Sequence, residues 1–432
     1  MSDSPVISST LPWLRKRHVI FAVAALVLIK LTILFGFALH ARIVMDEFGQ
    51  LGYAKFFGHG LFESIVPPKA VGFAAFYELA HFIGWDASSM VLTGRIMTAI
   101  LACATLAIVF STARTLSEDR LRALCVILVL LSFSNFIERI FRTIAEPLAV
   151  FFAAAALLVA LRGNTVTYKR VLLAGLLSGL AFLTTQKSVY FNLALGLGLT
   201  LDALLNGDWK SSLKRGVWLV AGWLLAIAGY CLLFGGSDPL PIAHSLVFGP
   251  LEVATRGGKE YGGLRSYVLQ TLIENMLLYP LCLAGIVLSL FKIRSLSGPK
   301  RIALIFTTII TALVFTHDQP WPYVFIMALP FMVLWIFVPL DAVSRRQDYS
   351  GALYALLAVG VVASFVRNTT YWQIDNAAQL ELASRADALL EPTELYFDGI
   401  GILPNHFEPS TLWLDRYYVL KTLAEGESSE AY

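Results

Sequence analysis

Apolar runs of roughly 20 residues recur from His18 almost to Arg367, and they restrict the fold more than any other feature of the sequence. A run of that length crosses the hydrocarbon core of a bilayer as a helix. In lipid, the backbone N–H and C=O groups must be paired within the chain, so these runs predict a bundle of helices. Charged residues make up only 15% of the chain, against roughly 25% in soluble domains. We therefore expect an all-α polytopic membrane protein.

Basic residues set the expected orientation of these runs, because Lys and Arg are enriched in cytoplasmic loops. With residues 1–17 in the cytoplasm, the short basic loops all fall on the inner side. The first run follows Arg15-Lys16-Arg17 and is too long for a signal-peptide core, so it is expected to be an uncleaved anchor. This arrangement predicts about 11 spans, near residues 19–40, 91–113, 121–137, 147–161, 171–186, 189–205, 216–234, 268–291, 302–316, 320–340 and 351–366.

The apolar segment 70–85 is excluded from these spans. It holds roughly 16 residues, fewer than a span needs, and Glu78 and His81 lie three residues apart, on one face of a helix. These features favour an interfacial helix. Counting the segment as a span would invert every later loop and break the charge bias. The expected domains are therefore a transmembrane domain of residues 18–367, with a first external loop at 41–90, and an external region at 368–432.

The sequence changes character after Arg367. Apolar positions at helical spacing predict a helix over 375–390, and residues 394–397 fit a short strand followed by a loop. A region of about 65 residues is small for a core of its own. We expect a small α+β appendage that packs on the external, periplasmic face of the membrane domain.

Two adjacent carboxylates, Asp46 and Glu47, stand where the first span ends and a polar, aromatic-rich loop begins. A carboxylate at the membrane surface can bind a cation or accept a proton from a hydroxyl group. Asp46 could equally be a helix N-cap, with Glu47 favouring the dipole of the first turn. The local sequence leaves both interpretations open.

The outer face also gathers other acidic and basic side chains. Glu146 lies close in sequence to Arg139 and Arg142, and Lys187 falls near an outer span end. Acids and cations together at one face suit a lipid-linked phosphate substrate, in which cations hold the phosphate and a carboxylate acts on the other reactant. The ionisable and polar candidates on this face are Lys69, Arg139, Arg142, Lys187, Arg256, Lys259, Arg265, His317 and Tyr323.

Other functional classes find little support. The net charge of +3 is too small to indicate nucleic-acid binding, and no RNA-binding aromatic motif occurs. All four cysteines lie inside apolar runs, which favours buried thiols over disulfides or zinc ligands. The sequence has no phosphate-cradling glycine motif, no H-E-x-x-H and no G-x-S-x-G.

An ordered set of short motifs resembles the GT-C glycosyltransferases of the protein-mannosyltransferase and aminoarabinose-transferase type. Met45-Asp46-Glu47-Phe48 is similar to the acidic pair of their first external loop. The remaining motifs follow in matching order: Val66-Pro67-Pro68-Lys69, Thr93-Gly94-Arg95-Ile96, Arg142-Thr143-Ile144-Ala145-Glu146-Pro147, Gly179-Leu180-Ala181-Phe182-Leu183-Thr184 with Lys187, and His317 through Tyr323 with Pro330. Lys69 follows the two prolines instead of preceding them, Glu146 replaces Asp, and His317 replaces Arg.

This resemblance implies a GT-C-like fold and transfer of a sugar from a polyprenyl-phosphate donor to a lipid, glycan or protein acceptor at the outer face. Asp46 would be the general base. Glu47 or Glu146 would position the acceptor or tune Asp46, since neighbouring carboxylates raise each other's pKa. Arg142, Lys187 and residues among Arg256, Lys259 and Arg265 would stabilise the departing phosphate. No metal ligand or cofactor is assigned, although a divalent cation is compatible with such a site.

Two other interpretations stay open. A transporter or flippase of a lipid-linked or anionic solute would share the hydrophobicity and the cationic cavity. It predicts charges near the bilayer midplane, where only Lys30 is expected and has no firm function. A structural assembly subunit would leave the external acids unexplained. The enzyme interpretation places the chain in the inner membrane of the cell envelope, with the N-terminus cytoplasmic, and predicts no nucleic-acid partner. Asn368-Thr369-Thr370 matches a glycosylation sequon.

Overall fold

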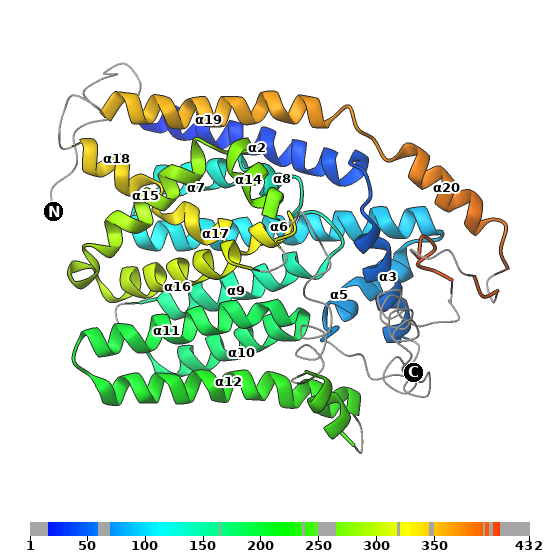
Figure 1. Cartoon of the computed structure of the whole chain (residues 1–432), viewed down its shortest axis with the longest axis horizontal. Helices are drawn as coiled ribbons and strands as arrows, with labels where there is room; N and C mark the ends of the chain where they lie inside the picture. The colour runs from blue at the N-terminus through cyan, green and yellow to red at the C-terminus, as the bar shows by residue number, and fades with distance from the viewer. Residues whose placement is uncertain are drawn as a thin grey trace.

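The computed structural model describes residues 16–58, 70–163, 166–235, 238–246, 248, 265–317, 320–344, 350–391, 394–396 and 401–406. These residues form an elongated helical bundle (Figure 1). The α-helices are α2 (Lys16–His40), α3 (Met45–Gly58), α5 (Phe73–Ile83), α6 (Ala87–Ser117), α7 (Arg120–Leu130), α8 (Ser134–Ile137), α9 (Ala145–Leu161), α10 (Tyr168–Thr184), α11 (Val189–Leu205), α12 (Trp209–Gly235), α14 (Arg265–Glu274), α15 (Leu278–Leu290), α16 (Gly298–Phe315), α17 (Leu329–Met332), α18 (Phe337–Ser344), α19 (Ser350–Tyr371) and α20 (Ala377–Asp387). Four 3₁₀ turns join them: η1 (Gln186–Ser188), η2 (Ile293–Ser295), η3 (Val324–Met327) and η4 (Val333–Trp335).

The long helices confirm the all-α polytopic membrane class. Six helices in the described chain are long and apolar enough to cross a membrane, or up to seven if the pair α14 and α15, bent by 96°, counts as one. These six are Arg17–His40, Ala87–Ser117, Gln186–Leu205, Trp209–Phe234, Gly298–Phe315 and Ala352–Tyr371. Other expected spans correspond to shorter apolar helices such as Ala145–Leu161 and Leu329–Ala342. Several runs counted as spans from the sequence are therefore broken or short helices.

Close backbone packing joins α10 to α12. A Cβ atom at Gly175 would collide with the carbonyl oxygen of Leu219, and one at Gly222 with that of Leu172. Small residues let membrane helices approach in this way, where van der Waals packing drives association.

Lys30 lies inside the bundle, between α2 and α19, and is fully buried. Its Nζ donates hydrogen bonds to Ser364 Oγ at 2.8 Å and to Asn368 Oδ1 at 2.6 Å. The ammonium also sits 4.0 Å from the ring centroid of Phe365. Lys30 thus joins the first and last long helices, and Asn368 of the sequon is a buried partner in that contact.

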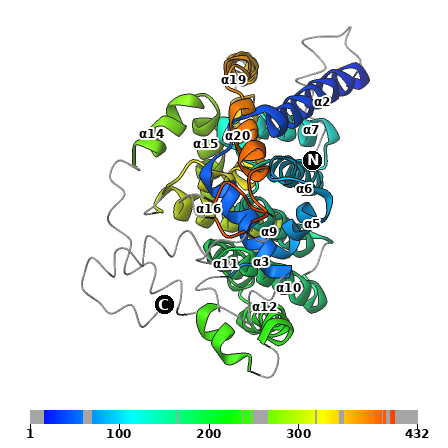
Figure 2. The same ribbon diagram turned by 90° about the vertical axis from the view of Figure 1, so that its right-hand side faces the viewer.

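The short helices α3, α5 and α20 gather at one end of the bundle (Figures 1 and 2). Helix α5 has 11 residues, about 16 Å at 1.5 Å per residue, so it is too short to span, as the sequence predicted. Its buried face includes Tyr77, and His81 lies 2.8 Å from the carbonyl oxygen of Leu51. The expected strand at 394–397 is not formed in its described part, since residues 394–396 have no regular structure.

Ion pairs at other loops also join helices of the bundle. Asp202 is 2.8 Å from both Arg215 and Arg301, which joins the ends of α11, α12 and α16. Arg122 of α7 is 2.7 Å from Asp341 of α18. These ion pairs lie away from α3 in the sequence and join helices of the membrane bundle.

Candidate active site

Glu47 lies in the first turn of α3 and is completely buried. Its carboxylate accepts hydrogen bonds from Arg95 Nε and Nη2, both at 2.7 Å, and from Arg142 Nη1 at 2.8 Å. Burial alone would raise the pKa of this carboxyl, but Arg95 and Arg142 lower it to about 2. Both oxygens are therefore occupied, and the group stays ionised at neutral pH.

Two backbone N–H groups complete the surroundings of Glu47. Val44 N donates to Oε1 at 3.0 Å and Thr143 N to Oε2 at 3.3 Å. The first bond is the glutamate half of a capping box, in which an acid at the third helical position reaches back to the N-cap. Glu47 therefore caps the start of α3 and also attaches this helix to the segment 138–146.

Arg142 is similarly engaged. Its Nη1 donates to the Arg42 carbonyl oxygen at 2.9 Å, its Nε to the Glu138 carbonyl oxygen at 3.2 Å and its Nη2 to the Tyr371 hydroxyl at 3.1 Å. With Glu47, these acceptors use every nitrogen of the guanidinium. Arg142 binds the loop before α3 to α19, which differs from the free phosphate ligand expected from sequence.

A second charged cluster joins residues from distant parts of the chain. Lys187 Nζ, in η1, is 2.7 Å from Glu146 Oε1, in the first turn of α9. The same ammonium is 4.7 Å from the ring centroid of Tyr323. Asp46 lies close enough to act electrostatically on both Lys187 and Tyr323. The fold thus brings together two candidate acids, a candidate cation and a candidate aromatic residue.

The helix ends explain this convergence. Glu146 precedes Pro147 at the start of α9, where an acid is favoured by the helix dipole and a proline is tolerated. Lys187 lies in the 3₁₀ turn between α10 and α11. Its side chain is 28% exposed, against 7% for Glu146, so the pair has one solvent-accessible side.

His317 lies beside this cluster. Its Nδ1 is 2.9 Å from the hydroxyl of Tyr190, and the two rings pack edge to face. Tyr190 belongs to α11, three residues after Lys187. His317 is therefore connected to the cluster by its contact with Tyr190.

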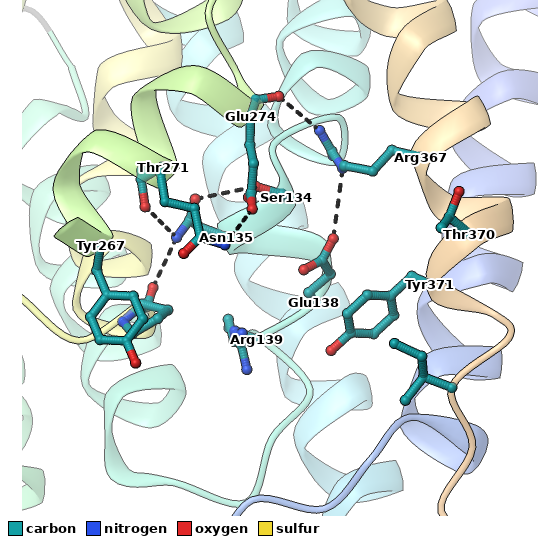
Figure 3. A pocket seen from close by; sticks show the side chains of 13 residues that line it. Ser134, Asn135, Glu138, Arg139, Tyr267, Thr271, Glu274, Arg367, Thr370 and Tyr371 are labelled. Atoms are coloured by element: carbon teal, nitrogen blue, oxygen red, sulfur yellow. Dashed lines mark hydrogen bonds and ion pairs between the residues drawn. The ribbon is translucent and has the colours of Figure 1, made fainter.

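A cavity of about 280 Å³ opens next to these clusters, between α8, α14 and α19 (Figure 3). Arg139 lies between Tyr267 and Tyr371 in its wall. Within the described part of the chain, its guanidinium forms no hydrogen bond or ion pair. An arginine keeps its charge in any protein environment, so this wall presents a permanent cation to the cavity.

Glu138 lines the same cavity, with Nε of Arg367 3.7 Å from its Oε1. Burial raises the pKa of Glu138 to about 7, although Arg367 and Arg139 oppose that rise. Polar side chains on α8 and α14 form the opposite wall, where Asn135 Nδ2 donates to Thr271 Oγ1 at 3.1 Å and Ser134 Oγ to Glu274 Oε2 at 2.8 Å. The cavity therefore combines a permanent cation with a buried carboxyl whose pKa is raised by burial.

The other candidates fall outside these contacts. Lys69, Arg256 and Lys259 lie outside the described residues. Arg265 is exposed at the first residue of α14. Over the described ranges, no three His, Cys, Asp or Glu side chains are grouped closely enough to hold a metal ion.

Sequence reasoning omitted Arg95, Arg367 and Tyr371 from the candidate residues. Arg95 carried a usable signal, because a charged residue inside an apolar helix requires a partner. Arg367 and Tyr371 stand at the end of the last long helix, where basic and aromatic residues are usual, so they gave no distinguishing signal.

Comparison with solved structures identifies the architecture. A crystal structure of the Archaeoglobus fulgidus oligosaccharyltransferase, in complex with Zn and sulfate, matches with a TM-score of 0.54 at 12% identity, over 81% of this chain and 53% of that one. The fold is GT-C-like. The archaeal oligosaccharyltransferase AglB from the same organism, in complex with an inhibitory peptide and a dolichol-phosphate, matches with a TM-score of 0.52 at 11% identity, over 84% of this chain and 56% of that one.

This GT-C-like chain spans little more than half the length of those structures. At such low identity the similarity defines the fold alone. No protein-family model and no curated protein sequence matches the chain. The fold agrees with the resemblance seen in the short motifs, and it places the chain among multi-pass membrane proteins.

Proposed function

We propose that this chain is an integral-membrane glycosyltransferase that moves a sugar from a polyprenyl-phosphate-linked donor to a lipid, glycan or protein acceptor. The observation that carries the proposal is the cluster of Asp46, Glu146, Lys187 and Tyr323 at one end of a GT-C-like membrane bundle. A carboxylate and a cation near a membrane surface match a reaction whose donor keeps its tail in the bilayer.

Asp46 is the general base in this proposal. As the acceptor hydroxyl oxygen bonds to the anomeric carbon, its proton passes to Asp46, and the bond between that carbon and the phosphate oxygen breaks. The electron pair stays on the lipid phosphate. Glu47 is a poor alternative base, since Arg95 and Arg142 occupy its carboxylate and hold its pKa at about 2.

The departing phosphate needs positive charge, and two cations offer it. Lys187 is accessible on the side not covered by Glu146. Arg139 has donors directed into the cavity, whereas the nitrogens of Arg142 are all bonded. We therefore assign the phosphate contacts to Lys187 and Arg139, and a structural role to Arg142. Fixed cations directed at developing charge are a major source of enzymatic rate acceleration.

The related fold supports a lipid-phosphate donor. The similar AglB structure contains a dolichol-phosphate and a peptide, which are ligands of the kinds proposed here. We further propose an inner-membrane location with a cytoplasmic N-terminus and an external C-terminal region. Reporter fusions should report cytoplasm after Lys210 and the outside after Asp375; a cytoplasmic signal at Asp375 would contradict the proposed side of the site.

Transport is the second candidate function, because Lys30 supplies a charge within a span. Both hydrogen bonds of its ammonium run to side chains of α19, and Lys30 is not among the residues that line the cavity. These contacts favour a helix-joining role over a solute-binding role, so we retain the enzyme proposal.

The test is transfer by the purified full chain from a panel of polyprenyl-phosphate-linked sugars to membrane extracts, followed by mass spectrometry of the products. A new glycoconjugate with one donor supports the proposal. Uptake of a lipid-linked solute into vesicles without any transfer would instead support the transporter.

Arg139 can be tested with the active donor. Arg139→Ala should raise the donor KM about 10- to 100-fold, the loss of roughly 1.5–3 kcal/mol expected for a hydrogen bond to a charged group. Arg385→Ala is a matched control, because Arg385 is 78% exposed on α20. An unchanged donor KM in Arg139→Ala would remove this residue from the phosphate site.

A further inference from the structure

The segment 375–387, which contains α20, crosses the loop that leads into α3. We call it the strap. Residues Ala41 and Asp375 form an isolated antiparallel bridge, and Asn376 Nδ2 donates to the Leu39 carbonyl oxygen at 2.9 Å. The strap therefore begins with contacts on the backbone of residues 39–41, at the end of the first span.

Gln379 makes the next contact, and it is a paired one. The N–H of Ile43 donates to Gln379 Oε1 at 2.8 Å, and Gln379 Nε2 donates back to the Ile43 carbonyl oxygen at 3.0 Å. The side-chain amide thus takes the place of a neighbouring strand for one residue of this loop. Such a pair fixes both the position and the rotation of the Ile43 peptide groups.

The opposite side of the loop is held by arginines. Arg95 Nη2 and Arg142 Nη1 donate to the Arg42 carbonyl oxygen at 3.0 and 2.9 Å. The loop is therefore held between the two arginines on one side and Gln379 on the other. Asp46 follows three residues after Ile43, in the first turn of α3. The position of its carboxylate therefore depends on the position of this loop.

The strap is itself anchored to the start of α6, the helix that carries Arg95. Ser384 Oγ donates to Asp86 Oδ2 at 2.7 Å, and Ala87 N donates to Asp387 Oδ2 at 2.9 Å. Leu380 packs against the cluster that includes Ile43 and Phe48. One helix of the C-terminal region thus sets the position of the Asp46 loop relative to α6.

We propose that Gln379 is a positioning residue for Asp46, and that the strap sets the reactivity of the site by fixing the loop that carries the base. This inference rests on the proposed function for its kinetic part alone. A displacement of about 1 Å at a catalytic group can cost roughly 10²-fold in rate, so a side chain that never touches substrate can control turnover.

The first test measures loop order without reference to activity. Hydrogen exchange is followed by mass spectrometry on peptides covering residues 39–50 in the full-length detergent-solubilised protein. Gln379→Ala should raise amide exchange at Ile43 and its neighbours at least about 10-fold, because the pairing that protects this loop is lost. Gln373→Ala, at an exposed glutamine just after α19, is the matched control and should leave the exchange unchanged.

The second test separates positioning from binding. Gln379→Ala should lower kcat about 10- to 100-fold while the donor KM stays within about twofold, because the phosphate contacts are on other segments. Gln379→Glu keeps the acceptor for the Ile43 N–H and loses the donor, so its kcat should be intermediate. Gln379→Asn keeps both groups but shortens the reach by one methylene, and should resemble Ala.

The outcomes distinguish the two proposals. If the loop amides exchange at the same rate in wild type and in Gln379→Ala, the strap proposal is overturned, whatever the activity. Faster exchange with unchanged kcat overturns the positioning role. A wild-type protein without transfer to any acceptor contradicts the proposed function, and the exchange experiment still decides whether the strap orders the loop. If Gln379→Ala does not fold, the same comparisons are made with Gln379→Glu.

Discussion

The Lys187 ammonium lies 2.7 Å from the Glu146 carboxylate, and the two residues come from the start of α9 and the turn before α11. Each was singled out from sequence as a separate candidate. In the proposed site the two act as one unit, in which Glu146 orients the partly exposed Lys187 ammonium. The pairing also means that the loss of either residue leaves the other charge without its partner.

Lys187→Ala should therefore raise the donor KM by about 10- to 100-fold, the effect of losing a charged hydrogen bond of roughly 1.5–3 kcal/mol. A purely structural lysine would act only by neutralising Glu146. The double variant Lys187→Ala with Glu146→Gln separates these roles in the same steady-state assay. Recovery of the donor KM in the double variant would assign Lys187 to structure, whereas a persistently high KM supports phosphate contact.

Glu47→Gln should destabilise the protein by about 3–5 kcal/mol, because two buried arginines lose their counter-charge. The folded-state pKa of about 2 lies below the ordinary 4.5, so this ion pair contributes stability fully above pH 4.5 and loses it as the pH falls through 2. Unfolding free energies in mixed micelles give the measurement. Glu381→Gln, in an exposed pair with Arg385, is the control; equal stability of both variants would contradict the role of Glu47.

We expect Glu138 to make the binding of the proposed donor sensitive to pH near neutrality. Its pKa is raised from 4.5 to about 7, so the carboxyl is neutral below that pH and negative above it. The groups acting on it are Arg367, Arg139, Glu274 and Arg142. Because a negative Glu138 offsets the charge of Arg139, the donor KM should rise as the pH increases through about 7. The proposed donor is a phosphodiester, whose own charge is constant in this range.

Glu138→Gln should abolish that dependence and hold the donor KM at its low-pH value, because the amide stays neutral. The linked effect on folding has the same origin: between pH 4.5 and 7 the folded protein keeps a proton that the unfolded chain has lost, so stability declines with rising pH. A wild-type KM that is flat between pH 6 and 8 would remove Glu138 from the binding site.

The sequence predicted the membrane class and the helical character of the bundle, because hydrophobic length is a local property of the chain. It also singled out Asp46, Glu146 and Lys187 as candidates, since charges at the ends of apolar runs are conspicuous, and their roles stay predictions. About 11 spans were expected, whereas six or up to seven helices of the described residues are long and apolar enough to cross a membrane. Segments such as α9, with 17 residues, form apolar helices that fall short of the roughly 20 residues a span needs. A hydropathy window measures composition and does not register where a helix begins, bends or breaks.

The sequence alone could not show which residue pairs with each charged side chain. Glu47 pairs with Arg95, which is 48 positions away, and with Arg142, which is 95 positions away. Gln379 binds the peptide group of Ile43, 336 positions away. Such contacts depend on how helices pack, and a glutamine on a polar helix gives no local signal. For the same reason, Arg142 looked like Arg139 in sequence, and only the packed structure separates the bonded guanidinium from the one facing the cavity.

Asp46→Asn is the decisive test of Asp46 as the general base. Asparagine keeps the size of the side chain and caps a helix about as well as aspartate, but it cannot accept the proton. The account predicts a folded protein with a normal donor KM and a kcat lower by roughly 10²–10⁴-fold, the usual contribution of a general base. Full kcat in Asp46→Asn at normal expression would contradict the account and leave Asp46 as a helix cap.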